Sequence, residues 1–177
     1  RNLDLRFFET GSVFLPAAGY AAQVQPQEIL TAALLLAGQP EASWHGQAGE
    51  YDYFALKGIL ERLAAAIGAG QLSFRVCRAE YLHPGRGAAI LLDGLPLGVI
   101  GELHPQVAEN YQLGGRVIVA ELALEPLFLA ALGRGNQDHD LPRYPASTRD
   151  IAVTGSDAVA ERQIEAAIRE AGGAILR

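Results

Sequence analysis

The chain has 177 residues, of which 50% are hydrophobic and 19% are charged, and its formal net charge is −6. This length and composition predict a soluble globular protein with either one domain or one domain and part of a second. The negative charge argues against nonspecific nucleic-acid binding, which needs a basic surface, although one local patch could still contact RNA. The longest apolar run, residues 32–37, is far shorter than the roughly 20 residues of a membrane span, so we expect no membrane contact.

Apolar segments with turn signals open the chain. Residues 3–9 and 12–15 are predicted strands, separated by a tight turn or bulge at Thr10-Gly11. Residues 25–38 fit two structures. A proline in the first turn and a glycine at the end suit a helix, whereas the continuous apolar run inside the segment suits a buried strand. The residues alone leave both alternatives open.

A helix is predicted over residues 52–67, with Asp52 as its N-cap. Apolar residues recur in this segment at a spacing of three to four, which predicts one buried stripe. The members of that stripe are Phe54, Ile59, Leu60, Leu63 and Ile67. Lys57, the only lysine of the chain, falls largely opposite the stripe and is expected to be a solvated side chain.

Alternation with a period of two marks the next segment. Residues 72–77 alternate as in a half-buried strand, and Cys77 is expected to be a small buried apolar residue. As the only cysteine, it excludes an internal disulfide and a multi-cysteine metal site, which fits a reducing cytoplasm. The elements expected after it are a hairpin of strands 88–92 and 97–103 that turns at Asp93-Gly94, a short helix over 105–111, a strand over 116–124 and a short helix over 125–132.

A polar stretch rich in glycine and proline, residues 134–145, predicts a linker between domains. After it, the sequence predicts a strand over 150–154 and a helix over about 158–171 that ends at Gly172-Gly173. One strand and one helix cannot bury a core, so we expect the second domain to be incomplete. The sequence contains no methionine, and we expect the chain to be an internal part of a longer protein.

Two segments that carry histidine are candidate sites. In the HPGR sequence of residues 83–86, His83 and Arg86 could present an imidazole and a guanidinium to a phosphate or a carboxylate. The alternative is a turn between strands in which Arg86 pairs with a carboxylate. Glu102 and His104 could complete a zinc or small-molecule site with His83, but a His-Glu-x-x-His motif is absent, and Glu102 suits the end of a strand. An enzyme in its own right, built on His83, Arg86, Glu102 and His104, is therefore the alternative function.

Arginine next to an aromatic residue follows the predicted linker. Arg143, Tyr144 and Arg149 could stack on an unpaired RNA base and neutralise a phosphate. The competing interpretation is a segment that caps a domain, with Arg149 paired to the adjacent Asp150.

Five short motifs follow one another along the chain. They are LRFFETGSVF at residues 5–14, YDYFALKG at 51–58, HPGR at 83–86, GELHP at 101–105 and YPASTRDIA at 144–152. In this order they resemble the C-terminal part of the β subunit of bacterial phenylalanyl-tRNA synthetase. The likeness spans nearly the whole chain, and it favours a strand over residues 25–38.

The resemblance implies an α+β fold. Residues 1–133 would form a non-catalytic, class II aminoacyl-tRNA synthetase-like core, an antiparallel β-sheet flanked by helices. Residues 134–145 would be the linker, and residues 146–177 would be the first βα unit of a truncated ferredoxin-like anticodon-binding domain. The implied function is to support the α2β2 heterotetramer with the α subunit and to bind tRNA(Phe), for the ATP-dependent attachment of phenylalanine to tRNA in the cytoplasm.

The chain itself is expected to lack catalytic residues, because a class II core needs arginines that hold ATP. One lies on a strand pair, where Arg6 is the nearest candidate, and a second lies in a glycine-rich strand and helix. Residues 117–132 contain neither that glycine pattern nor an arginine. The resemblance therefore implies that this fragment binds no cofactor or metal, and that ATP and Mg²⁺ serve the whole complex.

Overall fold

The computed structural model describes residues 4–16, 25–40, 44, 49–135, 145–156, 158–173 and 176. The chain divides into two compact units, Arg1–Asp138 and His139–Arg177. In their described parts, the first unit contains a β-sheet with three helices and the second contains one helix.

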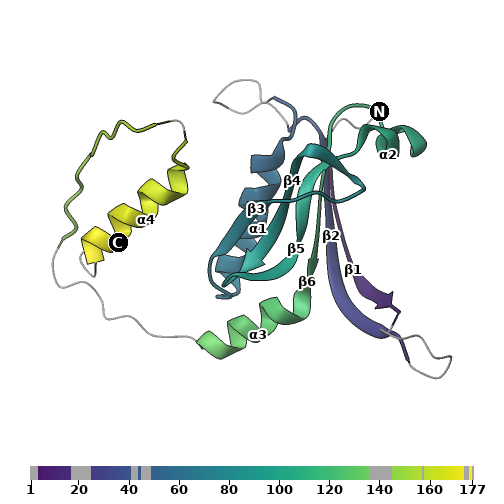
Figure 1. Ribbon diagram of the computed structural model, residues 1–177, viewed down its shortest axis with the longest axis horizontal. Coiled ribbons are helices and arrows are strands. Elements are labelled where there is room, and N and C mark those ends of the chain that lie inside the picture. Colours follow the sequence, from purple (N-terminus) through teal and green to yellow (C-terminus); the bar gives the residue numbers. More distant parts are fainter. Residues whose placement is uncertain are drawn as a thin grey trace. The chain divides into compact units, whose positions relative to one another are not determined.

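One antiparallel sheet forms the frame of the first unit (Figure 1). Within the described residues it has six strands, in the spatial order β1-β2-β6-β5-β4-β3, and all neighbouring pairs are antiparallel. In chain order the strands are β1 (Asp4–Leu15), β2 (Gln27–Gly38), β3 (Leu72–Val76), β4 (Leu82–Leu92), β5 (Leu95–Leu103) and β6 (Val117–Ala123).

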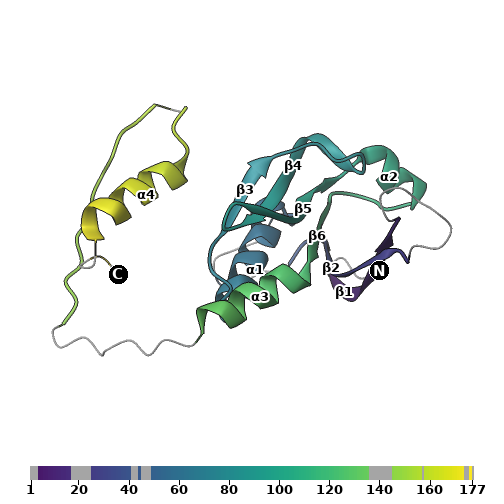
Figure 2. The same cartoon turned by 60° about the horizontal axis from the view of Figure 1, so that its bottom comes forward.

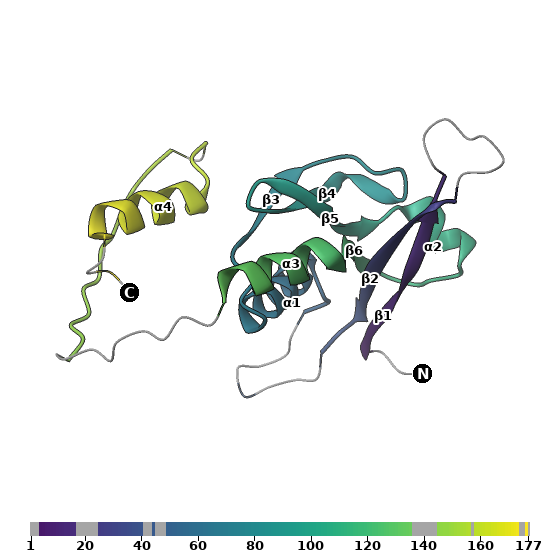
Figure 3. The same ribbon diagram turned by 90° about the horizontal axis from the view of Figure 1, so that it is seen from below.

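Helices α1 (Tyr53–Ala66) and α3 (Leu124–Arg134) lie on the same face of this sheet (Figure 2, Figure 3). Their apolar residues and those of the strands form one core cluster, in which Leu60, Ile100 and Leu127 are almost completely buried. The short helix α2 (Pro105–Asn110) follows β5, and His104 caps it. The prediction of an antiparallel sheet flanked by helices is therefore confirmed.

The first two strands differ from the prediction at one point. β1 is a single strand, because Thr10 and Gly11 pair with Ala32 and Thr31 in the middle of an unbroken β1–β2 register. Gly11 is not among the glycines with positive φ, so it forms no tight turn, and the predicted break at Thr10-Gly11 is wrong. Pairing with the continuous strand β2 keeps Thr10 and Gly11 extended despite the local turn signal. β2 itself resolves the ambiguity of residues 25–38 in favour of a strand.

Helix α1 begins and ends as predicted, and its buried face agrees in part with the predicted stripe. The Asp52 carboxylate accepts a hydrogen bond from the Ala55 N–H at 2.9 Å, which confirms the N-cap. The fully buried residues are Leu56, Leu60 and Ala64, whereas Phe54 and Leu63 of the predicted stripe are 71% and 36% exposed. Leu60, Ile59 and Ile67 of the predicted stripe do pack in or against the core, whereas Phe54 lies about 200° around the helix from Leu56, so its place in the stripe was wrong.

The remaining elements of the first unit lie close to their predicted segments, except that β4 begins at Leu82, well before the predicted strand over 88–92. The β4–β5 hairpin turns at Asp93 and Gly94, both with positive φ (50° and 82°), as a two-residue hairpin turn with an Asp-Gly sequence requires. β6, α2 and α3 match their predicted segments within two residues. Cys77 is only partly buried, because it follows the end of β3, where Val76 is already 84% exposed.

The second unit contains helix α4 (Glu161–Gly172), close to the predicted helix. The predicted strand over 150–154 is wrong for this chain, since the described residues 145–156 lie in no helix or strand. A strand needs a hydrogen-bonded neighbour, and the described part of this unit offers none. The ferredoxin-like fold therefore stays a prediction.

Candidate functional site

A groove of about 540 Å³ lies on the face of the sheet opposite α1 and α3, and we call it the open-face groove. Leu35 and Val119 line it, while their strand neighbours Leu36 and Ile118 belong to the core. Because side chains alternate along a strand, the groove and the core use opposite faces of the same strands. Its lining is mostly apolar.

The charged residues that line the open-face groove, among those the structure describes, are Glu9 and Glu121, and both are acidic. The Tyr81 hydroxyl donates a hydrogen bond to Glu121 Oε2 at 3.1 Å. Burial, reinforced by the nearby Glu121 carboxylate, raises the pKa of Tyr81 to about 12, so this phenol stays a neutral donor at physiological pH. The groove offers no described cation to a phosphate.

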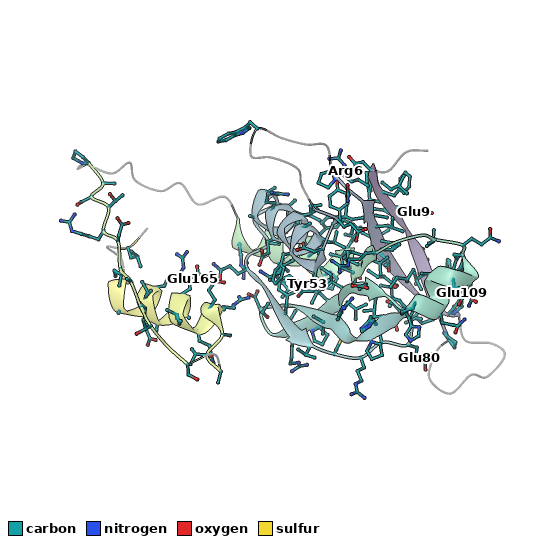
Figure 4. All side chains as sticks on the ribbon, turned by 90° about the horizontal axis from the view of Figure 1, so that it is seen from above. Arg6, Glu9, Tyr53, Glu80, Glu109 and Glu165 are labelled. Carbon is teal, nitrogen blue, oxygen red and sulfur yellow. The ribbon has the colours of Figure 1, made fainter. Side chains whose placement is uncertain are left out.

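Arg6 and Glu9 both belong to β1 (Figure 4), but only Glu9 lines the open-face groove. Arg6 instead pairs with Asp4 at 2.8 Å, and the Tyr51 hydroxyl donates to the same carboxylate at 2.7 Å. The residue suggested as nearest to a catalytic arginine is therefore part of a local ion pair at the start of the strand.

A second cavity, of about 500 Å³, lies at the N-terminal end of α1, and we call it the α1 pocket. Residues from α1, β3, β4 and β5 line it, together with Arg116, which precedes β6. Ala88 and Ile118 form part of its lining and belong to the core. The α1 pocket therefore lies on the helix-bearing face of the sheet, opposite the open-face groove.

Three aromatic rings form one side of the α1 pocket. Tyr53 contacts Phe54 and Phe74 edge to face, with ring centroids 5.4 Å and 6.3 Å apart, and Figure 4 shows it between α1 and the sheet. Burial raises the pKa of Tyr53 to about 12. Lys57 Nζ lies 5.2 Å from the Phe74 ring centroid and pairs with Glu61 at 2.9 Å, so the expected solvated lysine is held by two contacts.

Two arginines share one carboxylate at the other side of the α1 pocket. Arg86 Nη1 donates to both oxygens of Glu102 at 2.8 Å, and Arg116 Nε lies 3.4 Å from Glu102 Oε2. The Glu102 side chain is only 17% exposed, whereas those of Arg86 and Arg116 are 53% and 38% exposed. The cluster has a buried anion and two cations that reach solvent.

The structure brings together two of the four residues proposed for a site. The expected pairing of Arg86 with a carboxylate is confirmed, and the partner is Glu102. The histidines have local roles: His83 Nδ1 accepts the Gly85 N–H and His104 Nδ1 accepts the Gln106 N–H, each at 3.2 Å. The predicted turn at residues 83–86 is wrong, because they lie inside β4 at a shift of register. Among the described residues, no three His, Cys, Asp or Glu side chains form a metal-binding group.

Of the three residues predicted to contact RNA, Arg143 and Tyr144 lie outside the described residues. Arg149 is exposed, and its Nη1 donates to the Ser147 hydroxyl and the Thr148 carbonyl rather than to the expected Asp150.

Sequence reasoning missed Arg116 and the three aromatic residues of the α1 pocket. One sequence signal could have placed Arg86 and Glu102 on the helix-bearing face. Each lies two residues along its strand from a core residue, Ala88 and Ile100 respectively, and residues two apart in a strand share a face.

Comparison with solved structures identifies the class of fold. The chain is similar to the pyrrolysyl-tRNA synthetase of Desulfitobacterium hafniense, with a TM-score of 0.53 and 16% identity over 75% of this chain and 43% of that chain. A second structure of that synthetase gives a TM-score of 0.51. The chain therefore shares its fold with part of that synthetase. Among the described residues, no helix is long and apolar enough to cross a membrane.

The family follows from the sequence. The model of the phenylalanyl tRNA synthetase beta chain CLM domain matches residues 1–124, and the chain belongs to this family. It is 42% identical, over 98% of its length, to the phenylalanine–tRNA ligase beta subunit of Symbiobacterium thermophilum, and 38% identical over its full length to that of Moorella thermoacetica. It covers 19% and 22% of these relatives, so the chain spans about a fifth of their length.

Proposed function

We propose that the chain is a non-catalytic region of a phenylalanyl-tRNA synthetase β subunit. In this role it supports an α2β2 assembly and tRNA(Phe) binding, and ATP and Mg²⁺ act elsewhere in the complex. The observation that carries the proposal is the family match together with the acidic, mostly apolar open-face groove. A nucleotide triphosphate needs cations around its phosphates, and the described lining supplies only the carboxylates of Glu9 and Glu121.

The exposed edge of the sheet supports a role in assembly with the α subunit. β1 is an edge strand of 12 residues, and Phe7, Phe8 and Phe14 are 61%, 79% and 61% exposed. A long edge with apolar residues on both faces is a template for association, which native proteins cover or interrupt. We propose that a partner subunit covers it in the cytoplasmic complex.

The second unit supports the proposed contact with tRNA. Helix α4 places Ile164 and Ile168 on one side, with Leu176 beside them, and Ile168 is 37% exposed. In the described part of this unit, only Leu176 is seen beside this apolar side, and an exposed apolar stripe on a helix suits packing against further elements of a domain. In this proposal residues 146–177 begin an anticodon-binding domain, and Arg143, Tyr144 and Arg149 contact RNA.

Reconstitution tests the proposal. The full-length β subunit is combined with its α subunit, and aminoacylation of tRNA(Phe) and subunit association are measured for the wild type, Phe8→Asp in β1 and the control Phe128→Asp in α3. Both phenylalanines are exposed, so both variants should fold. We expect Phe8→Asp to weaken association and Phe128→Asp to leave it intact.

The isolated chain provides the complementary test. Calorimetric titration with phenylalanine should give no saturable signal, and the chain should not exchange pyrophosphate into ATP. Amino-acid activation by the isolated chain would overturn the non-catalytic assignment.

A further inference from the structure

We infer that the α1 pocket binds an unpaired nucleotide, whose base stacks on Phe54 and whose phosphate pairs with Arg86 and Arg116. The inference deepens the proposed function, because it takes tRNA as the source of that nucleotide. It concerns the first unit, whereas the RNA contacts proposed above belong to Arg149 and its neighbours in the chain.

The aromatic side of the pocket is built to hold a flat ring. Phe54 is 71% exposed, yet its orientation is fixed by the edge-to-face contact with Tyr53, which itself packs on Phe74. An exposed aromatic ring gains from stacking on a base, whatever the base, because every base has a π face. A ring that is already ordered loses little entropy when it stacks.

The charged side of the pocket holds donors that its own carboxylate does not saturate. A guanidinium carries five N–H donors, while Arg86 uses one nitrogen on Glu102 and Arg116 makes one looser contact of 3.4 Å. Both arginines reach solvent, and the carboxylate between them is mostly buried. Glu102 therefore orients two cations toward the pocket mouth, where a phosphate could accept from both.

The other acidic group of the pocket is already engaged. The Asp52 carboxylate also lines the pocket, but it accepts the Ala55 N–H and lies at the positive end of the helix dipole. The volume of about 500 Å³ falls within the range of about 300–1,000 Å³ that is usual for small-ligand sites. Size, aromatic surface and paired cations thus fit a nucleotide with one phosphate.

The test measures binding to the 177-residue chain by fluorescence anisotropy. The probe is a labelled short single-stranded oligoadenylate, and unlabelled AMP serves as competitor. We expect Phe54→Ala to weaken probe binding about tenfold, the size of one lost stacking contact. The matched control is Phe128→Ala, another exposed phenylalanine on a helix, and it should leave binding unchanged.

Charge variants separate binding from a purely structural role of the cluster. Arg86→Gln should weaken binding. It should also reduce the slope of log K against log[salt] by about 0.7, the contribution of one phosphate contact in a single strand. Arg75→Gln, on the exposed part of β3, should change neither the affinity nor this slope. Glu102→Gln keeps the shape of the side chain and removes the competing anion, so it should tighten binding. A merely structural cluster would give no gain in Glu102→Gln, and that result, or equal affinities for Phe54→Ala and the wild type, would overturn the inference.

The outcome with tRNA(Phe) distinguishes this inference from the proposed function. If the α2β2 complex binds tRNA(Phe) and the pocket variants bind it equally well, the pocket assignment fails and the proposed function stands. If pocket variants change oligoadenylate binding while tRNA(Phe) does not bind the complex, the nucleotide site stands and the tRNA role fails. Competition by AMP at the affinity of the oligoadenylate would identify a free mononucleotide as the source, with the same pocket chemistry.

Discussion

The burial pattern of helix α1 gives the sharpest stability prediction, because two leucines three residues apart differ in their exposure to solvent. Leu60 is 1% exposed within the core cluster, whereas Leu63 is 36% exposed. Leu60→Ala removes three carbon atoms from a packed site, which costs about 2.4 kcal/mol in transfer free energy at about 0.8 kcal/mol per methylene. With the cavity left behind, we expect a loss of about 3–4 kcal/mol in the free energy of unfolding.

Leu63→Ala is the matched control, since it changes the same side chain in the same helix. Much of Leu63 is already in water, so its truncation should cost about 1 kcal/mol or less. Urea titration followed by near-ultraviolet circular dichroism measures both, with the Tyr53 ring as a probe of the first unit. If Leu63→Ala cost as much as Leu60→Ala, the two leucines would be equally buried, and the packing described above would be refuted.

Three further predictions use the same titration. Gly98→Ala should destabilise the first unit severely, because an added Cβ would lie 2.6 Å from a backbone Cα of β6, whereas Gly58→Ala, at an open position in α1, should stabilise it by about 0.5–1 kcal/mol. Arg134→Gln removes a 2.6 Å ion pair with Asp93 in which both side chains are about half exposed, and it should cost about 1 kcal/mol or less. The pKa of Tyr81 rises from 10.0 to about 12 on folding, so Tyr81 ionises first in the unfolded chain. The contribution of neutral Tyr81 to the free energy of unfolding is complete below pH 10 and is lost as the pH rises to 12. Tyr81→Phe should therefore reduce the loss of stability over this pH range.

Local signals predicted the boundaries of elements well. The N-cap at Asp52 and the Asp93-Gly94 turn depend on the backbone within a few residues, so the sequence alone was sufficient for both. The turn predicted at Thr10-Gly11 failed for the converse reason. Its outcome depends on β2, more than 20 residues away in the sequence, whose unbroken register holds both residues in a strand.

The candidate site was predictable only in part, because its residues meet through the sheet. A carboxylate partner for Arg86 could be expected from charge alone, but Glu102 lies 16 residues away, and strand pairing decides that it is the partner. Arg116 joins the same carboxylate from the start of β6, and no sequence pattern connects these positions. Phe54 was assigned to a buried helix stripe and Phe74 to a half-buried strand, since periodicity does not distinguish a core position from the wall of a pocket.

Strand alternation separates the core of this fold from the lining of the open-face groove. Leu36 and Ile118 build the core, while their neighbours Leu35 and Val119 line the open-face groove. A change at a groove position therefore leaves the packed layer beneath α1 and α3 in place. Glu121 likewise lines the groove and takes no part in the core cluster. The family fold alone therefore does not imply catalysis.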